Sequence, residues 1–284
     1  MCGRYAASAD PDDLVEIFEV EVAALDRPAR SLLKSPQDPP AGSPDHNMAP
    51  TKAAPVVLAR PAAGEGDANG TRTSSPVTRQ LRLLTWGLVP SWSTDPGTGV
   101  RMINARAETV LDKPAYRRAA TSRRCLVPAA GWYEWQASPV ARDTRGRPRK
   151  QPFFISRADE KTLALAGLYE FWKDPTLAAD HPEAWLVTFA VVTTAAEPGL
   201  DLIHSRQPVV LDPPDWQGWL DPTLTDAGHV ADLLTPPEPG RFQAWPVSTA
   251  VNAARNTGPD LIRPVPSDQL VGVVDPQTGE VLPG

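Results

Sequence analysis

Short apolar runs alternate with polar, proline-rich segments along the whole chain. Seven of these runs are rich in β-branched or aromatic residues and end at glycine, proline or charged positions, which is typical of β-strands. They are APVVLAR (54–60), LRLLTWGLVPSW (81–92), RRCLVPAAGWYEW (123–135), PFFISR (152–157), LALAGLYEFW (163–172), WLVTFAVVTT (185–194) and PVVLD (208–212).

Three other segments have the pattern of helices. Residues 10–20 start with acidic side chains and then place apolar residues on one side, and residues 107–123 and 214–222 are also predicted to be helical. Many short strands interleaved with a few helices predict an α+β fold with mostly antiparallel pairing.

Eleven of the 33 prolines lie in four segments that predict loops. These are residues 27–46, 60–79, 136–150 and 173–184. Apolar runs continue on both sides of each segment, so we interpret them as insertions in one domain, residues 2–284, rather than as linkers.

Composition narrows the environment of the protein. No apolar run is long enough to span a membrane, and the N-terminus lacks the pattern of a secretory signal. The two cysteines, Cys2 and Cys125, form neither a metal motif nor a disulfide framework, so we expect a reducing, cytoplasmic location and no metal or cofactor. The net charge is −6, yet 22 of the 28 basic residues are arginines, so a nucleic-acid surface would have to be local.

Cys2 has an unusual position directly after the initiator methionine. A small second residue usually allows removal of Met1, which would leave Cys2 with a free α-amine beside its thiol. Both groups titrate at about pH 8 to 9, so each is partly available as a nucleophile near neutral pH. The alternative is a disordered terminal residue without a role.

Two further segments carry polar residues where a core would have none. MINARAET (102–109) places Asn104, Arg106 and Glu108 at alternate positions of a predicted strand-to-helix junction, which could also be a helix cap with a surface salt bridge. Glu134 lies between Tyr133 and Trp135, so its pKa could be raised for acid–base work, unless it lies on an exposed strand face.

Histidine and aromatic positions add weaker signals. His204 follows an apolar stretch and precedes Arg206, although a lone histidine is more often structural. HNMAPT (46–51) and WGLVPSW (86–92) could present rings that stack on exposed bases, or they could simply pack in the core.

Taken together, eight motifs occur in the order and character of one family. They are MCGRY, NMAPT, WGLVPSW, INARAET, RRCLVPAAGWYEW, AGLYEFW, FAVVTTAA and IHSRQPVVL. The chain thereby resembles the SOS-response-associated peptidase (SRAP) family, the abasic-site processing proteins, over residues 2–265. It departs from the family at Gln207, where methionine is usual, and residues 271–284 have no clear counterpart.

The resemblance implies a covalent reaction with single-stranded DNA that contains an abasic site. Cys2, freed of Met1, would form a thiazolidine with the sugar aldehyde. Glu134 and His204 resemble the family's proton-transfer residues, and Asn104 resembles the asparagine that orients the terminal amine. The implied fold is a compact α+β domain with a curved, mostly antiparallel, barrel-like core and helices outside, and we expect a monomer.

The resemblance also implies a DNA-binding surface. Arg4, Arg106 and Arg206 would bind phosphates, and Trp86, with Trp92, Pro50 and Thr51 as less certain partners, would support stacking and kinking beside the lesion. Cys125 is predicted to be a buried core residue.

Two other functions stay open at this point. A thiol peptidase could use Cys2 with histidine and glutamate or asparagine, and its first substrate could be its own N-terminal peptide. A non-covalent single-strand binder would need the arginines and aromatic residues, but not the terminal thiol.

Overall fold

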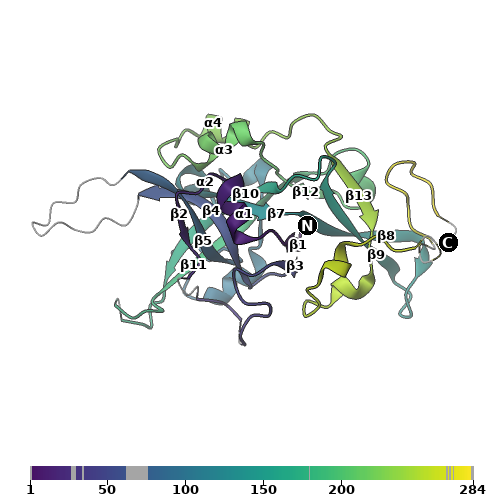
Figure 1. Cartoon of the computed structure of the whole chain (residues 1–284), viewed down its shortest axis with the longest axis horizontal. Helices are drawn as coiled ribbons and strands as arrows, with labels where there is room; N and C mark the ends of the chain where they lie inside the picture. Colours follow the sequence, from purple (N-terminus) through teal and green to yellow (C-terminus); the bar gives the residue numbers. More distant parts are fainter. Residues whose placement is uncertain are drawn as a thin grey trace, which may run out of the picture.

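A closed five-stranded β-barrel forms the centre of the molecule (Figure 1). The computed structural model describes residues 2–26, 30–33, 35–61, 76–178, 180–266, 268, 270 and 272–282. The barrel strands are β4 (Ala53–Pro61), β5 (Val77–Trp86), β7 (Arg124–Ala129), β10 (Leu163–Lys173) and β11 (Trp185–Ala195). Antiparallel ladders join β11, β10, β7, β4 and β5 in that order, and a parallel pairing of β11 with β5 closes the ring. The structure therefore confirms the predicted α+β fold with a mostly antiparallel, barrel-like core.

A second, fully antiparallel sheet lies beside the barrel and contains the N-terminal strand. Its order is β13 (Phe242–Pro246), β9 (Pro148–Arg157), β8 (Gly131–Arg142), β1 (Arg4–Ala7) and β3 (Asp45–Met48). Three short strands extend the barrel sheet: β2 (Val22–Ala24), β6 (Asn104–Arg106) and β12 (Arg206–Pro208). The helices are α1 (Pro11–Ile17), α2 (Arg117–Ser122), α3 (Pro213–Leu220) and α4 (Ala227–Leu233), with short 3₁₀ turns η1 (Pro96–Arg101), η2 (Ala107–Thr109), η3 (Leu200–Leu202), η4 (Thr249–Asn252) and η5 (Pro259–Ile262).

Alternation along the barrel strands creates two separate apolar layers. One set of side chains fills the barrel interior, where Trp86 stacks on Phe189 with 6.3 Å between ring centroids. The other set faces outward and is covered by helices, as where Phe18 after α1 stacks on Trp216 of α3. Both layers consist of buried apolar side chains, and burial of apolar area of this kind is the main stabilising contribution to such a fold.

Two of the three predicted helices are correct, and the third is predicted to be longer than it is. The predictions over 10–20 and 214–222 correspond to α1 and α3. The prediction over 107–123 is wrong in extent, because only η2 and α2 form at its two ends. Pro114 interrupts it, since proline disfavours helical geometry in the residue before it and cannot donate a helical hydrogen bond.

The predicted loop at 136–150 is wrong. These residues form the outer half of the β8–β9 hairpin, which pairs as far as Arg142 opposite Pro148. Pro139 is tolerated because the register shifts between Ala137 and Arg142, where the ladder does not need its missing N–H. Of the other predicted loops, 27–46 gains β3 at its end, 173–184 connects β10 to β11, and 60–79 gives residues to β4 and β5. Residues 62–75 lie outside the described part.

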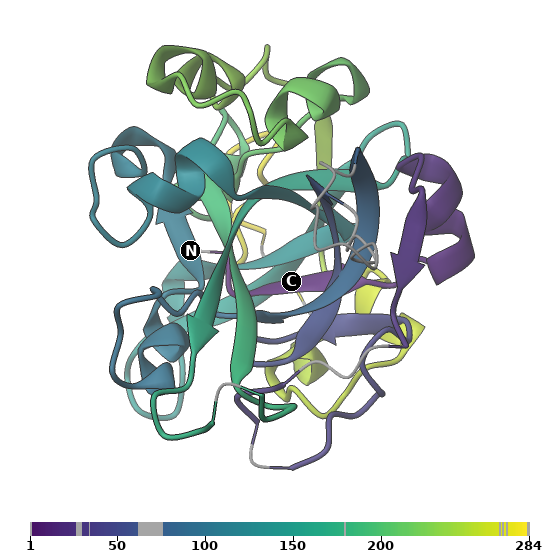
Figure 2. The ribbon, with the colours of Figure 1, turned by 90° about the vertical axis from the view of Figure 1, so that its left-hand side faces the viewer.

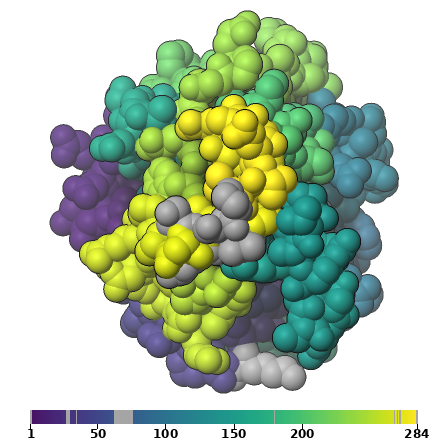
Figure 3. Space-filling model, turned by 90° about the vertical axis from the view of Figure 1, so that its right-hand side faces the viewer, coloured from purple at the N-terminus to yellow at the C-terminus, as the bar shows by residue number. Residues whose placement is uncertain are grey.

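The C-terminal segment, unassigned by sequence, packs beside the β8–β9 hairpin (Figure 3). The buried Gln136 side chain receives a hydrogen bond from Val274 N–H and donates to the carbonyls of Val274 and Leu202. This contact connects the segment to the strand of Glu134 and to the turn before His204.

Candidate active site

Cys2 lies at the edge of the second sheet, where β1 runs between β8 and β3. Arg4 pairs with Tyr133 and Tyr5 with Trp132, so the antiparallel register directs the preceding residues toward Glu134. The Cys2 side chain is fully buried, and its carbonyl accepts a 2.7 Å hydrogen bond from Asn104 Nδ2. Cys2 is thus held in the core by paired backbone and by an asparagine that is distant in sequence.

Asn104 reaches Cys2 because β6 is fixed in parallel against β11, with Asn104 opposite Val191. The loop before β6 depends on a close approach of two backbones at Gly87 and Gly99. Gly87 has φ +125°, and a Cβ atom there would lie 2.6 Å from the Gly99 carbonyl oxygen. Asn104 Oδ1 is buried and has no hydrogen-bond partner among the described residues, which leaves an acceptor at the N-terminal residue.

Glu134 is a buried carboxyl group on β8, with only 2% of the residue exposed. Burial disfavours its charged form and raises the pKa of Glu134 to about 7. Near neutral pH the group is therefore divided between its protonated and ionised forms, as a general acid–base group requires. The prediction that Glu134 has a raised pKa is supported, and the exposed-face alternative is excluded.

His204 follows the η3 turn and faces Glu134, with 3.9 Å between Nδ1 and Glu134 Oε1. Nδ1 lies 3.1 Å from the Arg206 backbone nitrogen, whose N–H can donate to it, and 3.4 Å from the Arg206 carbonyl oxygen; the shorter contact favours the neutral tautomer with its proton on Nε2. Partial burial lowers the pKa of His204, so the ring is mostly neutral at pH 7.

The thiol of Cys2 is not activated in the chain that still carries Met1. Burial raises the pKa of the Cys2 thiol, and the nearby charge of Glu134 raises it further. A thiol of this kind stays protonated at neutral pH, whereas cysteine nucleophiles react as thiolates.

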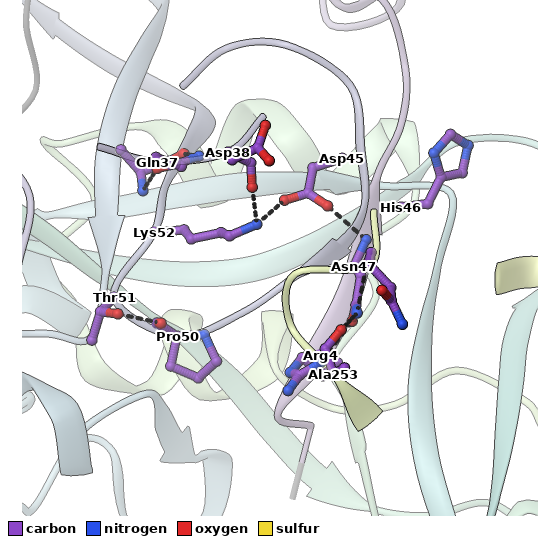
Figure 4. A network of polar contacts seen from close by, with 12 residues as sticks. Arg4, Gln37, Asp38, Asp45, His46, Asn47, Pro50, Thr51, Lys52 and Ala253 are labelled. Carbon is purple, nitrogen blue, oxygen red and sulfur yellow. Dashed lines mark hydrogen bonds and ion pairs between the residues drawn. The ribbon is translucent and has the colours of Figure 1, made fainter. Parts of the chain in front are cut away.

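Arg4 belongs to an internal polar network (Figure 4). Its guanidinium donates 2.8 Å hydrogen bonds to Asn47 Oδ1 and to the Val251 carbonyl. The backbone N–H of Asn47 in turn donates a hydrogen bond to the Asp45 carboxylate, and Asp45 forms a buried 2.6 Å ion pair with Lys52. Arg4 therefore joins β1 to the segment after β13, in addition to any role toward DNA.

The other two arginines differ in how their charges are balanced. The Arg206 guanidinium forms a two-pronged ion pair with Glu108 and donates to the Thr193 carbonyl. The salt-bridge alternative for Glu108 is therefore correct, and hydrogen bonds from Arg206 lower the pKa of Glu108. Arg106 is exposed and makes no side-chain hydrogen bond or ion pair within the described part of the chain.

The structure distinguishes the predicted stacking residues. Trp86 is fully buried, packs edge-on against Tyr5 and donates its indole N–H to the Ile103 carbonyl, so it is a core residue and not a stacking surface. Trp92 is 66% exposed and is the aromatic ring of that segment available to a base. Pro50 and Thr51 form a partly exposed turn, and Thr51 has φ +75°, which is rare for a β-branched residue and indicates a constrained turn.

Other sequence predictions have simple outcomes. Cys125 is fully buried in the barrel, as predicted. Gln207 accepts a hydrogen bond from Glu197 N–H, which accounts for a polar residue at that position. Within the described ranges no helix is long and apolar enough to cross a bilayer, and no cluster of metal-ligating side chains occurs.

Sequence reasoning missed Asn47 and Gln136, two buried polar side chains that support the site. Asn47 was detectable as a polar residue between Asp45 and Met48 in a stretch that also carries a motif. Gln136 gave no such signal, because its partners lie 66 and 138 residues away.

Comparisons with known proteins agree with this fold. The sequence pattern of the family described as "SOS response associated peptidase (SRAP)" matches residues 1–254, and the chain belongs to this family. A relative from Bacillus subtilis, "Abasic site processing protein YoqW", is 32% identical over 265 residues, covering 92% of this chain and 99% of that protein. "Abasic site processing protein HMCES" from Rattus norvegicus is 30% identical over 300 residues, covering 95% and 77%. The solved structure of a protein from Bacteroides thetaiotaomicron has the same fold, with TM-score 0.67, 21% identity and coverage of 93% and 100%.

Proposed function

We propose that this protein processes abasic sites in single-stranded DNA by forming a covalent link through Cys2 after removal of Met1. The observation that carries the proposal is the convergence of four groups: the terminal cysteine, Asn104 bonded to it, and the buried Glu134 facing His204. The names of the relatives, abasic site processing proteins, point to the same lesion.

The proposed reaction uses both nucleophiles of a terminal cysteine. The opened sugar presents an aldehyde at C1′, the α-amine adds to it, and loss of water gives an imine. The thiol S–H then adds across the C=N bond, so sulfur bonds to C1′, nitrogen gains the proton, and a five-membered thiazolidine forms. Protonated Glu134 would supply the proton for departure of water, and its carboxylate would then relay the thiol proton to the nitrogen.

Asn104 and His204 have separate tasks in this scheme. Asn104 holds the Cys2 carbonyl with Nδ2, and its unpartnered Oδ1 is an acceptor for the new α-amine, which would orient the nitrogen lone pair. His204, neutral with its proton on Nε2, would exchange a proton with the sugar oxygen during ring opening.

In the chain that still carries Met1, burial keeps the Cys2 thiol protonated, which disfavours peptidase chemistry at that stage. A peptidase needs a thiolate for the first attack, whereas the imine route needs the thiol only in the second step. Glu134 beside the thiol also opposes thiolate formation. A self-cleavage at Met1 by these residues stays a further possibility of the same site.

The direct test is incubation of the purified protein with a single-stranded oligonucleotide that carries one abasic site. We expect a heat-stable adduct on a denaturing gel, an intact mass that lacks Met1, and no adduct with the undamaged strand. A preparation that retains Met1 but forms the adduct at full rate would disprove the aminothiol mechanism.

A second prediction concerns the charged residues Arg106, Glu108 and Arg206. Arg106→Ala should weaken binding to undamaged single strands and reduce the salt dependence by about 0.7 log units per log unit of salt, as expected for one lost phosphate contact. Glu108→Gln should instead strengthen binding, because it frees Arg206 from its ion pair. Salt titrations followed by fluorescence anisotropy measure both effects. Unchanged slopes in both variants would mean that the strand binds elsewhere.

A further inference from the structure

His204 follows the short η3 turn directly, so the position of this turn determines where its ring lies. The backbone N–H of His204 donates to the Leu200 carbonyl at 3.0 Å, which fixes the histidine to the start of the turn. Its Nδ1 lies 3.9 Å from Glu134 Oε1, a distance beyond that of a direct hydrogen bond. A small displacement of η3 would therefore move the ring relative to Glu134 and to a bound sugar.

One buried side chain connects this turn to the strand of Glu134. Gln136 lies two residues after Glu134 on β8, so both side chains point to the same face of the sheet. Gln136 Nε2 donates to the Leu202 carbonyl at 3.1 Å and to the Val274 carbonyl at 2.9 Å, and Gln136 Oε1 accepts the Val274 N–H at 2.7 Å. Only 2% of Gln136 is exposed. Three hydrogen bonds to this buried amide thus join the last residue of η3 to β8 with a defined geometry.

Val274 belongs to a small hairpin near the C-terminus, residues 272–282, which we call the C-terminal hairpin. Val274 pairs with Val281 across it, and Leu282 N–H donates to the Val273 carbonyl at 2.8 Å. Views from the two ends of the molecule agree on its place. The yellow C-terminal part of the chain lies behind the barrel in Figure 2, and in Figure 3 it lies in front, beside the β8–β9 hairpin.

The C-terminal hairpin also contacts the start of η3. Gly199 precedes this turn with φ +91°, and a Cβ atom there would lie 3.1 Å from the Pro276 carbonyl oxygen. Val273 is 3% exposed and belongs to the same core cluster as Leu200 and Ile203. The turn is therefore held by the C-terminal hairpin as well as by β8.

We propose that Gln136 and the C-terminal hairpin position His204 for the abasic-site reaction. Gln136 is then a positioning residue, because it bonds to η3 and to the C-terminal hairpin and acts on the reaction through the orientation of the histidine ring. The match to the family ends at residue 254, so the C-terminal hairpin lies beyond the part of the chain that the family pattern covers. The inference rests on the proposed function, in which His204 moves a proton.

The test replaces Gln136 by methionine, which has a similar size but cannot form these three hydrogen bonds. We expect Gln136→Met in the full-length protein to slow single-turnover adduct formation at saturating abasic DNA by roughly 100-fold, as for a catalytic group displaced by about 1 Å. Affinity for an undamaged single strand should be unchanged, because the bonds of Gln136 lie inside the protein.

Gln151→Met is the matched control. Gln151 lies opposite Gln136 on β9, is 5% exposed and donates to the Pro152 and Val247 carbonyls instead of to η3. Its replacement should lower stability toward urea by about as much as Gln136→Met does, but it should leave the rate of adduct formation at the wild-type value. An equal loss of rate in both variants would contradict the proposal.

A double-mutant cycle with His204→Ala separates positioning from a general loss of structure. If Gln136 acts through His204, Gln136→Met should slow the reaction by less than about threefold in a protein that already carries His204→Ala. A loss as large as in the wild-type background would show that Gln136 does not act through the histidine. Val274→Pro, which removes the N–H that Gln136 accepts, should reproduce the loss and its dependence on His204, and a normal rate in this variant would also overturn the proposal.

NMR titration of the histidine rings distinguishes this inference from the proposed function, because it needs no DNA. Partial burial lowers the pKa of His204, whose signal is assigned by its loss in His204→Ala. If Gln136→Met releases η3, the pKa of His204 should rise toward its usual value, whereas Gln151→Met should leave it unchanged. A wild type that forms no adduct, together with this rise, would refute the proposed function but not the positioning by Gln136. An unchanged pKa of His204 in Gln136→Met, together with normal adduct formation, would refute the positioning alone.

Discussion

Glu134→Gln is expected to slow adduct formation by about 10²–10⁴ and to stabilise the folded protein above neutral pH. The rate falls because an amide can neither donate the proton for departure of water nor accept the thiol proton. Single-turnover gel assays measure the loss. The rate of adduct formation by the wild type should decline as pH rises above about 7, where Glu134 loses its proton. The rate of the variant should not show this decline.

The stability gain follows from the same burial. A glutamate whose pKa is raised on folding binds its proton more tightly in the folded state than in the unfolded state. The protonated side chain therefore makes its full contribution to stability below the pKa of the unfolded state. That contribution is lost as pH rises through about 7. At about 1.4 kcal/mol per pKa unit, the change from 4.5 to about 7 corresponds to roughly 3 kcal/mol above pH 7. The neutral glutamine avoids this cost, because it carries no charge to bury.

Urea unfolding at pH 5 and pH 8 checks this prediction. We expect a gain for Glu134→Gln at pH 8 that is much smaller at pH 5. Glu170→Gln is a matched control: Glu170 is equally buried, but it forms a 2.6 Å ion pair with Arg123, so its replacement should not stabilise the protein. If Glu134→Gln lowers stability at pH 8 as Glu170→Gln does, the carboxylate is structural and its assignment as the acid–base group is wrong.

The candidate catalytic residues can be singled out from the sequence because their chemistry is local. Cys2 is distinctive by position, and Glu134 is distinctive by its aromatic neighbours, so neither needs knowledge of the fold. The barrel closure was not predictable in detail, because the parallel pairing of Phe189 with Trp86 joins segments more than a hundred residues apart and depends on the packing of both.

The sequence could not distinguish among the proposed DNA-binding residues for the same reason. Trp86 and Trp92 lie in one motif, and only the fold determines that the first ring fills the barrel while the second is exposed. Arg106 and Arg206 look equivalent in sequence, but Glu108, 98 residues before Arg206, compensates one of them. Burial and charge compensation are properties of long-range contacts, which a local pattern does not contain.

Cys2→Ala should abolish the heat-stable adduct completely and yet leave a protein that can be trapped on abasic DNA. Alanine is also small, so Met1 should still be removed and the α-amine should still be terminal. The amine can form the imine with the opened sugar, but no thiol is present to close the thiazolidine. Borohydride should therefore reduce the imine to a permanent secondary amine, which denaturing gels detect. The same imine makes β-elimination at the sugar easier, so some strand cleavage is expected as well.

The other cysteine is the control for this experiment. Cys125 is fully buried in the barrel, so Cys125→Ala should form the adduct as the wild type does. Intact mass must show that Met1 is absent from both variants. A peptidase that attacks carbonyl groups through its thiol predicts neither borohydride trapping nor a requirement for an abasic site. If Cys2→Ala, free of Met1, cannot be trapped while the wild type forms its adduct, the amine does not react first. The buried thiol would then have to attack the sugar directly, against the raised pKa that its surroundings impose.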